Sequence, residues 1–319
     1  MSAVRHISAL SLLVITLAIP LSLGAAPGKG LGMWVWSSSS FSTEEARREL
    51  IRFCVNHRIT HLDVYLNLSG DNEMPVLRDG EAFRDLILLA GRHRITTAAL
   101  RGSPKMFFSE NHDQALRELR ALMAFSRTLP EGNLFRGIKY DVEPYLTREW
   151  KAQGKCPKAV MRDYLTFLRK AKSLLHDHAP RLLLAADIPF WWDKDDFVIE
   201  FEGSTKRLSE HVQDLTDFVV IMSYKRSVQK VLDSVENERR YAKKINKVIF
   251  PSLETVELKK DPEASFWGLP SREFWDVVPR LLEEANGDPA MGGVNIHCYR
   301  SLLKKFNKEP SAERVKEGP

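Results

Sequence analysis

Residues 137–145 read Gly-Ile-Lys-Tyr-Asp-Val-Glu-Pro-Tyr. The predicted fold and the predicted site of this chain both depend on this stretch. Its first half has the β-branched and aromatic residues of a strand. Because side chains alternate between the two faces of a strand, Lys139, Asp141 and Glu143 are expected to point the same way. Pro144 cannot donate to a ladder, so the strand should end there. Two carboxylates at a strand end are costly in a core and useful in a site; a solvated strand end is the alternative.

Strand-like and helix-like segments alternate along the chain. The predicted strands span residues 32–36, 60–66, 95–100, 137–143, 182–188, 218–222, 248–253 and 291–298. The predicted helices span residues 42–55, 81–91, 114–127, 157–178, 208–215, 228–245 and 271–285. Eight strands that alternate with helices over roughly 270 residues are typical of the α/β class and of a (β/α)8 TIM barrel.

The competing arrangement is an open, doubly wound sheet. Such a sheet usually carries a glycine-rich phosphate loop after its first strand. Here residues 37–40 are four serines, and no Gly/Ser-rich linker divides the chain. The sequence therefore favours a single barrel domain, which we place at residues 27–303.

The composition is that of an ordinary soluble globular protein, since 44% of the 319 residues are hydrophobic and 28% are charged. The formal net charge is +5, and the basic residues are scattered among Asp and Glu. This pattern indicates a solvated surface rather than a nucleic-acid footprint. Residues 304–319 are expected to form a charged, weakly ordered C-terminal tail.

The first 26 residues have the features of a secretory signal peptide. Arg5 and His6 precede an apolar run from Leu10 to Leu23, and small residues follow as far as Ala26. This order of charge, apolar core and small residues is typical of a cleaved signal. An uncleaved anchor is the alternative, but the run is short for a span and contains a proline. We therefore expect an exported protein, periplasmic or secreted, with no stable membrane insertion after cleavage.

The three cysteines are Cys54, Cys156 and Cys298. They lie far apart and have no metal-ligand spacing. Export permits a disulfide but leaves at least one thiol free. Cys54 and Cys298 lie in apolar patterns, which predicts buried thiols.

The active site of a (β/α)8 barrel lies at the carboxyl ends of its strands. The predicted strands deliver mostly acidic and aromatic side chains there. These are Trp34, Trp36, Asp63, Tyr65, Asn67, Arg101, Asp141, Glu143, Tyr145, Asp187, Trp191, Trp192, Tyr224, Glu254, Asn295, His297 and Tyr299. Tryptophan faces stack on sugar rings and carboxylates bind sugar hydroxyls, so a carbohydrate site is predicted. The alternatives are core packing for Trp34, Trp191 and Trp192, and a structural role for His297 and Asp187.

Paired carboxylates have a defined chemistry in glycoside hydrolysis. About 5 Å apart they serve as acid/base and nucleophile in retaining enzymes, and a wider gap admits water for inversion. Glu143 is the predicted proton donor, with Asp141 as the neighbour that tunes it. Glu254, after the seventh strand, is the predicted partner across the barrel mouth. The alternative interpretation is that Glu254 begins an exposed loop, because charged residues follow it in the sequence.

Asp141-Val-Glu143 on the fourth strand, with Met222-Ser-Tyr224 ending the sixth, resembles the family 18 chitinase-like glycoside hydrolases. Those enzymes are (β/α)8 barrels with Asp-x-Glu and Met-x-Tyr at these strands. The resemblance implies that Glu143 is the general acid. It also implies that Asp141 orients the acetamido group of the substrate and that Tyr224 supports this group.

The chain departs from that family at three points. The family's upstream Asp falls at Lys139, its acidic residue after the sixth-strand Tyr falls at Lys225, and residues 294–298 lack its eighth-strand Trp. A second, partial resemblance is to the clan A retaining glycosidases, which place an acid/base Glu, often followed by Pro, on the fourth strand and a nucleophile Glu on the seventh. It implies a nucleophile role for Glu254, although Val142 stands where those enzymes usually have Asn.

These observations predict an exported glycoside hydrolase that cleaves a polysaccharide or an envelope glycan without a metal or organic cofactor. The predicted catalytic residues are Glu143, Asp141 and Glu254. The predicted substrate-binding residues are Trp36, Asp63, Tyr65, Arg101, Tyr145, Asp187, Trp192, Tyr224 and His297. The sequence does not indicate an oligomeric state.

Two other functions fit the same barrel. A non-catalytic glycan-binding barrel is suggested by Lys139, because an ion pair with Asp141 would hold that carboxyl ionised. Another hydrolase, such as a phosphodiesterase, would require paired histidines or a metal cluster at the strand ends. The candidates for such residues are His61 and His297.

Overall fold

The computed structural model describes residues 29–69 and 75–308. The predicted signal peptide, residues 1–26, lies outside the described residues, as do residues 309–319 of the predicted tail. None of the described helices is long and apolar enough to cross a membrane.

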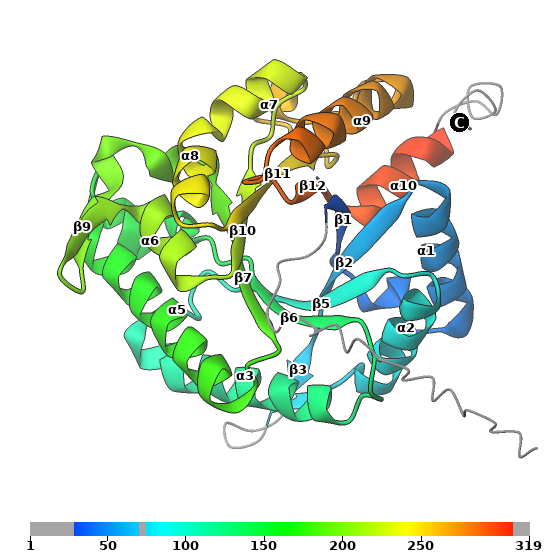
Figure 1. The fold of residues 1–319 in the computed structure, drawn as a ribbon, viewed down its shortest axis with the longest axis horizontal. Coiled ribbons are helices and arrows are strands. Elements are labelled where there is room, and N and C mark those ends of the chain that lie inside the picture. Colours follow the sequence, from blue (N-terminus) through cyan, green and yellow to red (C-terminus); the bar gives the residue numbers. More distant parts are fainter. Residues whose placement is uncertain (1–28, 70–74, 309–319) are drawn as a thin grey trace, which may run out of the picture.

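Eight parallel strands close into a barrel, which confirms the predicted fold (Figure 1). They are β1 (Gly30–Val35), β2 (Ile59–Tyr65), β5 (Thr96–Arg101), β6 (Phe135–Tyr140), β7 (Leu183–Pro189), β10 (Phe218–Met222), β11 (Val248–Glu254) and β12 (Gly293–His297). The strands follow one another around the barrel in chain order, and β12 pairs with β1 to close it. Because every neighbouring pair is parallel, all eight carboxyl ends meet at one rim.

Helices cover the outside of the barrel (Figure 1). They are α1 (Glu44–Asn56), α2 (Gly80–Arg92), α3 (His112–Arg127), α4 (Arg148–Ala152), α5 (Lys158–His178), α6 (Leu208–Leu215), α7 (Val228–Ser234), α8 (Glu236–Lys244), α9 (Ser271–Gly287) and α10 (Tyr299–Lys308). Two short antiparallel pairs lie in the loops, β3 (Leu68–Ser69) with β4 (Val76–Leu77) and β8 (Val198–Phe201) with β9 (Ser204–Arg207).

The start of α1 shows how the sequence fixes a helix end. The hydroxyl of Thr43 accepts a hydrogen bond from the Ala46 N–H at 3.2 Å, which satisfies one of the free donors of the first turn. Glu44 and Glu45 lie in that turn, near the positive end of the helix dipole. Leu50 and its apolar neighbours then face the barrel.

One predicted helix differs from the structure. The segment predicted as one helix over residues 228–245 is two helices, because Val235, with φ −117° and ψ 8°, leaves helical geometry between α7 and α8. Helix α10, in a segment for which no helix was predicted, continues past residue 303 as far as Lys308.

The fourth barrel strand is shorter than predicted. It ends at Tyr140 instead of 143. Glu143, at φ −109° and ψ 76°, has left the extended conformation, and Pro144 opens a 3-10 helix, η3 (Pro144–Leu146). Simple strand alternation therefore does not extend to Glu143, and the backbone turns that follow Tyr140 set the direction of its side chain.

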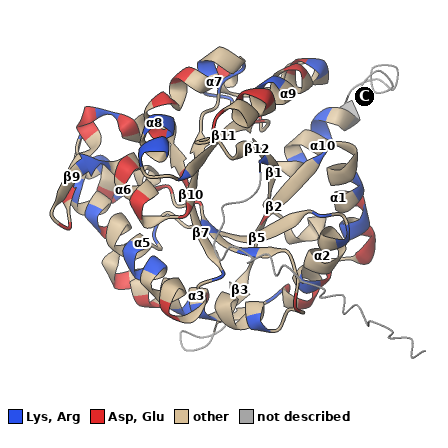
Figure 2. Ribbon diagram, viewed as in Figure 1, with Lys and Arg blue, Asp and Glu red and all other residues tan. Residues whose placement is uncertain are grey.

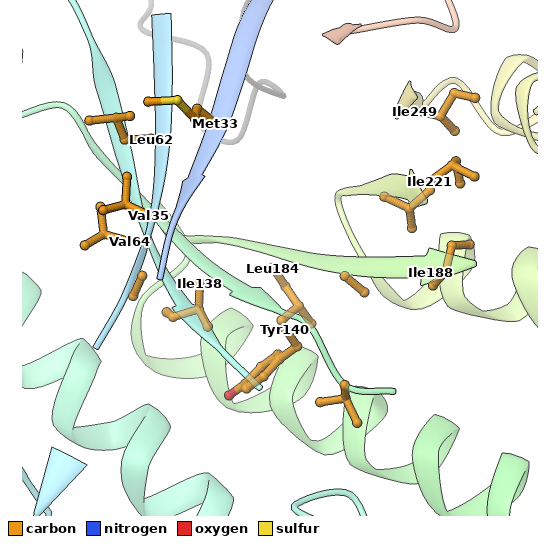
Figure 3. Packing of buried hydrophobic residues seen from close by; sticks show 14 of the residues in the cluster. Met33, Val35, Leu62, Val64, Ile138, Tyr140, Leu184, Ile188, Ile221 and Ile249 are labelled. Carbon is orange, nitrogen blue, oxygen red and sulfur yellow. The ribbon is translucent and has the colours of Figure 1, made fainter. Parts of the chain in front are cut away.

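Apolar side chains pack on both faces of the barrel wall. Outward-facing residues such as Val64, Ile138 and Leu184 belong to the larger core cluster, beneath the helices (Figure 3). Inside the barrel, the rings of Phe218 and Phe250 lie 5.3 Å apart near the amino ends of their strands. The apolar filling of this end leaves the carboxyl-end rim to polar groups.

Gly137 allows β6 to approach β7 closely. Its φ is +152°, and a Cβ there would lie 2.1 Å from the carbonyl oxygen of Leu183. Only glycine avoids both problems. Gly137, the first residue of the stretch 137–145, is therefore required by the packing of the barrel strands.

Lys and Arg are interspersed with Asp and Glu over the outer helices (Figure 2). All three cysteines are free, and Cys54 and Cys298 are buried as predicted. Burial raises the pKa of the Cys54 thiol, so this sulfur stays protonated and unreactive.

Candidate active site

A buried lysine occupies the centre of the barrel. The Lys139 side chain has no exposed surface, and its Nζ lies 2.6 Å from Asp63 Oδ2 and 3.1 Å from Asp187 Oδ1. The same ammonium lies 3.7 Å from the ring centroid of Trp34, a cation–π contact. The ion pair between Lys139 and Asp141 that would favour a binding barrel is therefore not formed, because the lysine extends between β2 and β7 and pairs with Asp63 and Asp187.

Asp63 is the most heavily bonded member of this cluster. His61 Nε2 lies 2.8 Å from its Oδ1, and Asn295 Nδ2 donates to its Oδ2 at 3.1 Å. Burial alone would raise the pKa of Asp63, but Lys139 and His61 outweigh burial and hold that pKa below its usual range. Asp63 is thus a fully buried anion that supports the barrel, and its predicted contact with substrate is corrected.

Asp187 lies on the other side of Lys139 and accepts a hydrogen bond from Trp34 Nε1 at 3.1 Å. Burial raises the pKa of Asp187 to about 7, and the charge of Asp63 adds to this, although Lys139 opposes it. The side chain has no exposed surface, so the predicted contact of Asp187 with substrate is also corrected.

The raised pKa of Asp187 predicts a pH dependence of stability. The unfolded carboxyl has a pKa of about 3.9, so folding takes up a proton between about pH 4 and about pH 7. Its contribution to stability is fully present below that window and is lost as the pH rises through it. We expect the free energy of unfolding of the wild type to fall relative to that of Asp187→Asn across the window, in urea titrations. Parallel profiles would contradict this, and the exposed Asp196→Asn serves as the control that follows the wild type.

Asp141 lies above the buried cluster, towards the rim. Its backbone N–H donates to the Arg101 carbonyl at 2.8 Å, and a Cβ at Gly102 would lie 2.1 Å from the Asp141 carbonyl oxygen, so Gly102 makes room for this turn. Burial raises the pKa of Asp141 well above its usual range, and the charges of Asp187 and Glu143 raise it further. Its Oδ1 is buried and bonds to no described residue.

Glu143 is held by a tyrosine two residues away. The Tyr145 hydroxyl donates a hydrogen bond to Glu143 Oε2. Burial, followed by the charge of Glu143, raises the pKa of Tyr145, so this hydroxyl remains a donor. The Tyr145 ring in turn packs edge-on against Trp191, with centroids 5.2 Å apart. Both Glu143 and Tyr145 are partly exposed at the mouth.

Tyr224, just after β10, lies where carboxyl groups from three strands converge. Burial is the largest cause that raises its pKa well above the usual range. Nearby negative charges raise it further, in the order Glu254, Asp141, Asp187 and Glu143. The Tyr224 ring also stacks on the imidazole of His297, with centroids 6.3 Å apart. This phenol therefore stays protonated and can donate a hydrogen bond to a ligand.

Glu254 is buried at the end of β11, with 3% of its surface exposed, so it does not begin an exposed loop. Its Oε1 accepts a hydrogen bond from the Val256 N–H at 2.6 Å. His297 Nδ1 lies 3.0 Å from Oε1 and 2.9 Å from Oε2. The other imidazole nitrogen of His297 accepts a hydrogen bond from Trp36 Nε1 at 2.7 Å.

Arg101 and Tyr65 form the neighbouring part of the rim. The Arg101 Nη2 lies 2.5 Å from Glu118 Oε2 on α3, and Nη1 donates to the Leu66 carbonyl. Its guanidinium lies 5.6 Å from the Tyr65 ring centroid, and that ring is 5.5 Å from Trp36. Arg101 is thus fixed by an ion pair, while the Tyr65 and Trp36 rings remain partly exposed.

Trp192 is not a sugar platform. It has no exposed surface, stacks on Trp150 with centroids 6.2 Å apart, and packs edge-on against Tyr164 at 5.5 Å. A ring without an exposed face cannot stack on a sugar. The core alternative therefore holds for Trp192, whereas Trp191 is partly exposed.

The sequence interpretation missed the buried cluster that Lys139 organises. A signal for it was present, because Asp187 interrupts an otherwise apolar strand and Asp63 lies between the apolar residues Leu62 and Val64. A carboxylate buried inside the barrel needs a cation partner, and Lys139 lies on β6, between β2 and β7 in the order of strands around the barrel. Among the described residues, no group of three or more His, Cys, Asp and Glu side chains is arranged to hold a metal ion.

No protein-family model matches the sequence, and no curated protein matches it. Solved structures match its fold. A GH18 chitinase from Cycas revoluta in complex with (GlcNAc)3 has 13% identity and a TM-score of 0.56, over 86% of this chain and 96% of that chain. A GH113 β-1,4-mannanase has 10% identity and a TM-score of 0.53, over 86% and 88%. The GH39 enzyme from Xanthomonas axonopodis pv. citri has 12% identity and a TM-score of 0.54, over 88% and 60%.

These likenesses establish the fold. The chain is a (β/α)8 barrel similar to those of family 18, 113 and 39 glycoside hydrolases, which confirms the resemblance in fold inferred from the motifs at Asp141 and Tyr224. Because one barrel fold hosts many chemistries, function must be argued from the site.

Proposed function

We propose that this protein is an exported glycoside hydrolase that cleaves a glycosidic bond in a polysaccharide or an envelope glycan. Glu143 is the proton donor, Asp141 orients the substrate, and Glu254 is the second carboxylate. The observation that carries the proposal is that Asp141 and Glu143, which follow β6, and Glu254, at the end of β11, lie at the same rim of the closed barrel. Export rests on the signal-like residues 1–26.

Glycosidic cleavage needs a proton for the leaving oxygen and negative charge near the developing oxocarbenium ion. Glu143 suits the first task, because Tyr145 holds its Oε2 and the side chain is partly exposed at the mouth. Glu254 suits the second, because Val256 and His297 fix it at the opposite side of the mouth.

Asp141 supports binding of a polar substrate group. Buried polar atoms are almost always hydrogen-bonded, yet its Oδ1 has no partner among the described residues. The raised pKa of Asp141 favours its protonated form, which can both donate and accept a hydrogen bond. The Tyr224 hydroxyl adds a second donor beside it. A sugar hydroxyl or amide group would satisfy both.

The proposal is tested with the wild-type protein on a panel of polysaccharides and aryl glycosides. We expect new reducing ends from at least one glycan class, and the anomer of the first product decides whether Glu254 acts as nucleophile or as base. A protein that is inert on the whole panel but binds one of these glycans would overturn the proposal in favour of a binding barrel.

The two other functions have less support. The ion pair that suggested a binding barrel is not formed, because Lys139 pairs with Asp63 and Asp187. For a phosphodiesterase, His61 is engaged on both nitrogens, by Asp63 and by Thr96 Oγ1 at 2.7 Å. Loss of activity on chelation would nevertheless favour a metal-dependent hydrolase over the proposed one.

A further inference from the structure

We infer that Trp36 and His297 form a hydrogen-bonded relay to Glu254. Trp36 fixes the proton of the His297 imidazole at Nδ1, and His297 in turn orients the Glu254 carboxylate. Both are then positioning residues rather than sugar platforms. The inference deepens the proposed function, on which it rests for the role of Glu254 as the second carboxylate. In this inference Trp36 and His297 position Glu254, whereas the sequence predicted that they contact the substrate.

The relay follows from hydrogen-bond chemistry. An indole N–H is a donor only, and Trp36 Nε1 lies 2.7 Å from His297 Nε2. That imidazole nitrogen must therefore accept the bond and carry no proton. A neutral imidazole has one N–H, which is then at Nδ1 and points at the Glu254 carboxylate at 2.9 and 3.0 Å. One indole thus selects the tautomer that donates to Glu254.

The surroundings of His297 hold this arrangement in place. Trp34 packs edge-on against the imidazole at 5.5 Å and an interplanar angle of 85°, while Tyr224 stacks on its face at 6.3 Å and 24°. The titratable groups that face the ring are Glu254 from β11 and Tyr224 after β10. The ring is thus wedged between strands β1, β10 and β11, and rotation of the imidazole would break both hydrogen bonds.

The relay also opposes a second proton on His297. Protonation of Nε2 would set two N–H donors against each other across the 2.7 Å contact with Trp36. Trp36 therefore favours the neutral imidazole, so that Glu254 receives a hydrogen bond but no full positive charge. A carboxylate that must attack a sugar or take a proton from water keeps more of its reactivity in this state than beside an imidazolium.

The test measures the tautomer of the His297 imidazole by 15N NMR on the full chain. The proteins compared are the wild type, Trp36→Phe and Trp275→Phe. Trp275 is the matched control, because its ring stacks on His57 at 4.8 Å while its N–H bonds to no described residue. We expect the wild type to show the Nδ1–H tautomer, as the hydrogen bonds to Trp36 and Glu254 require. In Trp36→Phe the Nε2–H tautomer should become populated, because Nε2 no longer has to accept a hydrogen bond from the indole, and Trp275→Phe should match the wild type.

Activity provides a separate readout. On a glycan that the wild type cleaves, Trp36→Phe should lower kcat roughly tenfold, the worth of one strong hydrogen bond. An Nε2–H tautomer in the wild type, or the same tautomer populations in Trp36→Phe and in the wild type, overturns the relay even if the protein is a hydrolase. The Nδ1–H tautomer in a protein that cleaves no glycan supports the relay and overturns the proposed function instead.

Discussion

Replacing Glu143 by glutamine is expected to lower kcat by roughly 100- to 10,000-fold on any glycan that the wild type cleaves, which is the usual worth of general acid catalysis. Glutamine keeps the shape of the side chain and can still accept the hydrogen bond from Tyr145. It cannot deliver a proton to the leaving oxygen. Because the change is isosteric, KM should change far less than kcat, which initial-rate measurements over a range of substrate concentrations will show.

The matched control is Glu149→Gln, on α4 close to Glu143 in the chain. Glu149 is exposed and lies in the first turn of a short helix, so this variant should keep wild-type turnover. Equal activity of Glu143→Gln and wild type would leave the protein a hydrolase but move the proton donor elsewhere. An aryl glycoside with a good leaving group should lose less activity than a polysaccharide, because its leaving oxygen needs less protonation.

The barrel itself was predictable because its signals are local. Parallel strands buried on both faces give apolar runs such as 182–188, and helices give apolar stripes, so the alternation of the two can be read along the chain. The positions of Asp141, Glu143 and Glu254 at the rim follow from the fold, since strand ends meet there.

The partners of the site residues were not predictable in the same way. Whether Lys139 pairs with Asp141 or with Asp63 and Asp187 depends on where a flexible side chain extends across the barrel. The burial of Trp192 depends on how the loop after β7 folds back onto α5. These contacts join residues far apart in sequence, and a single sequence carries no trace of them beyond residue type.

Replacing Lys139 by methionine is expected to lower the free energy of unfolding by about 3–5 kcal/mol, the cost of removing one partner from a buried ion pair. Methionine can keep the packing of the stem against Trp34 but leaves Asp63 and Asp187 without their cation. Urea unfolding followed by tryptophan fluorescence and by circular dichroism measures the change. The exposed Lys151→Met should change stability by about 0.5 kcal/mol or less.

The pH dependence of the Lys139→Met deficit separates lost charge from lost packing. In the wild type the pKa of Asp63 is depressed, so its stabilisation is present above the unfolded value of about 3.9 and is lost as the pH falls. Without Lys139 this gain disappears, and burial of an unpaired carboxylate makes the folded state take up protons. The deficit should therefore be larger at about pH 7 than at about pH 4, and neutralising both carboxyls, as Asp63→Asn and Asp187→Asn in the Lys139→Met background, should recover part of it. A deficit that is equal at both pH values would mean that packing, and not the buried charge cluster, gives Lys139 its importance.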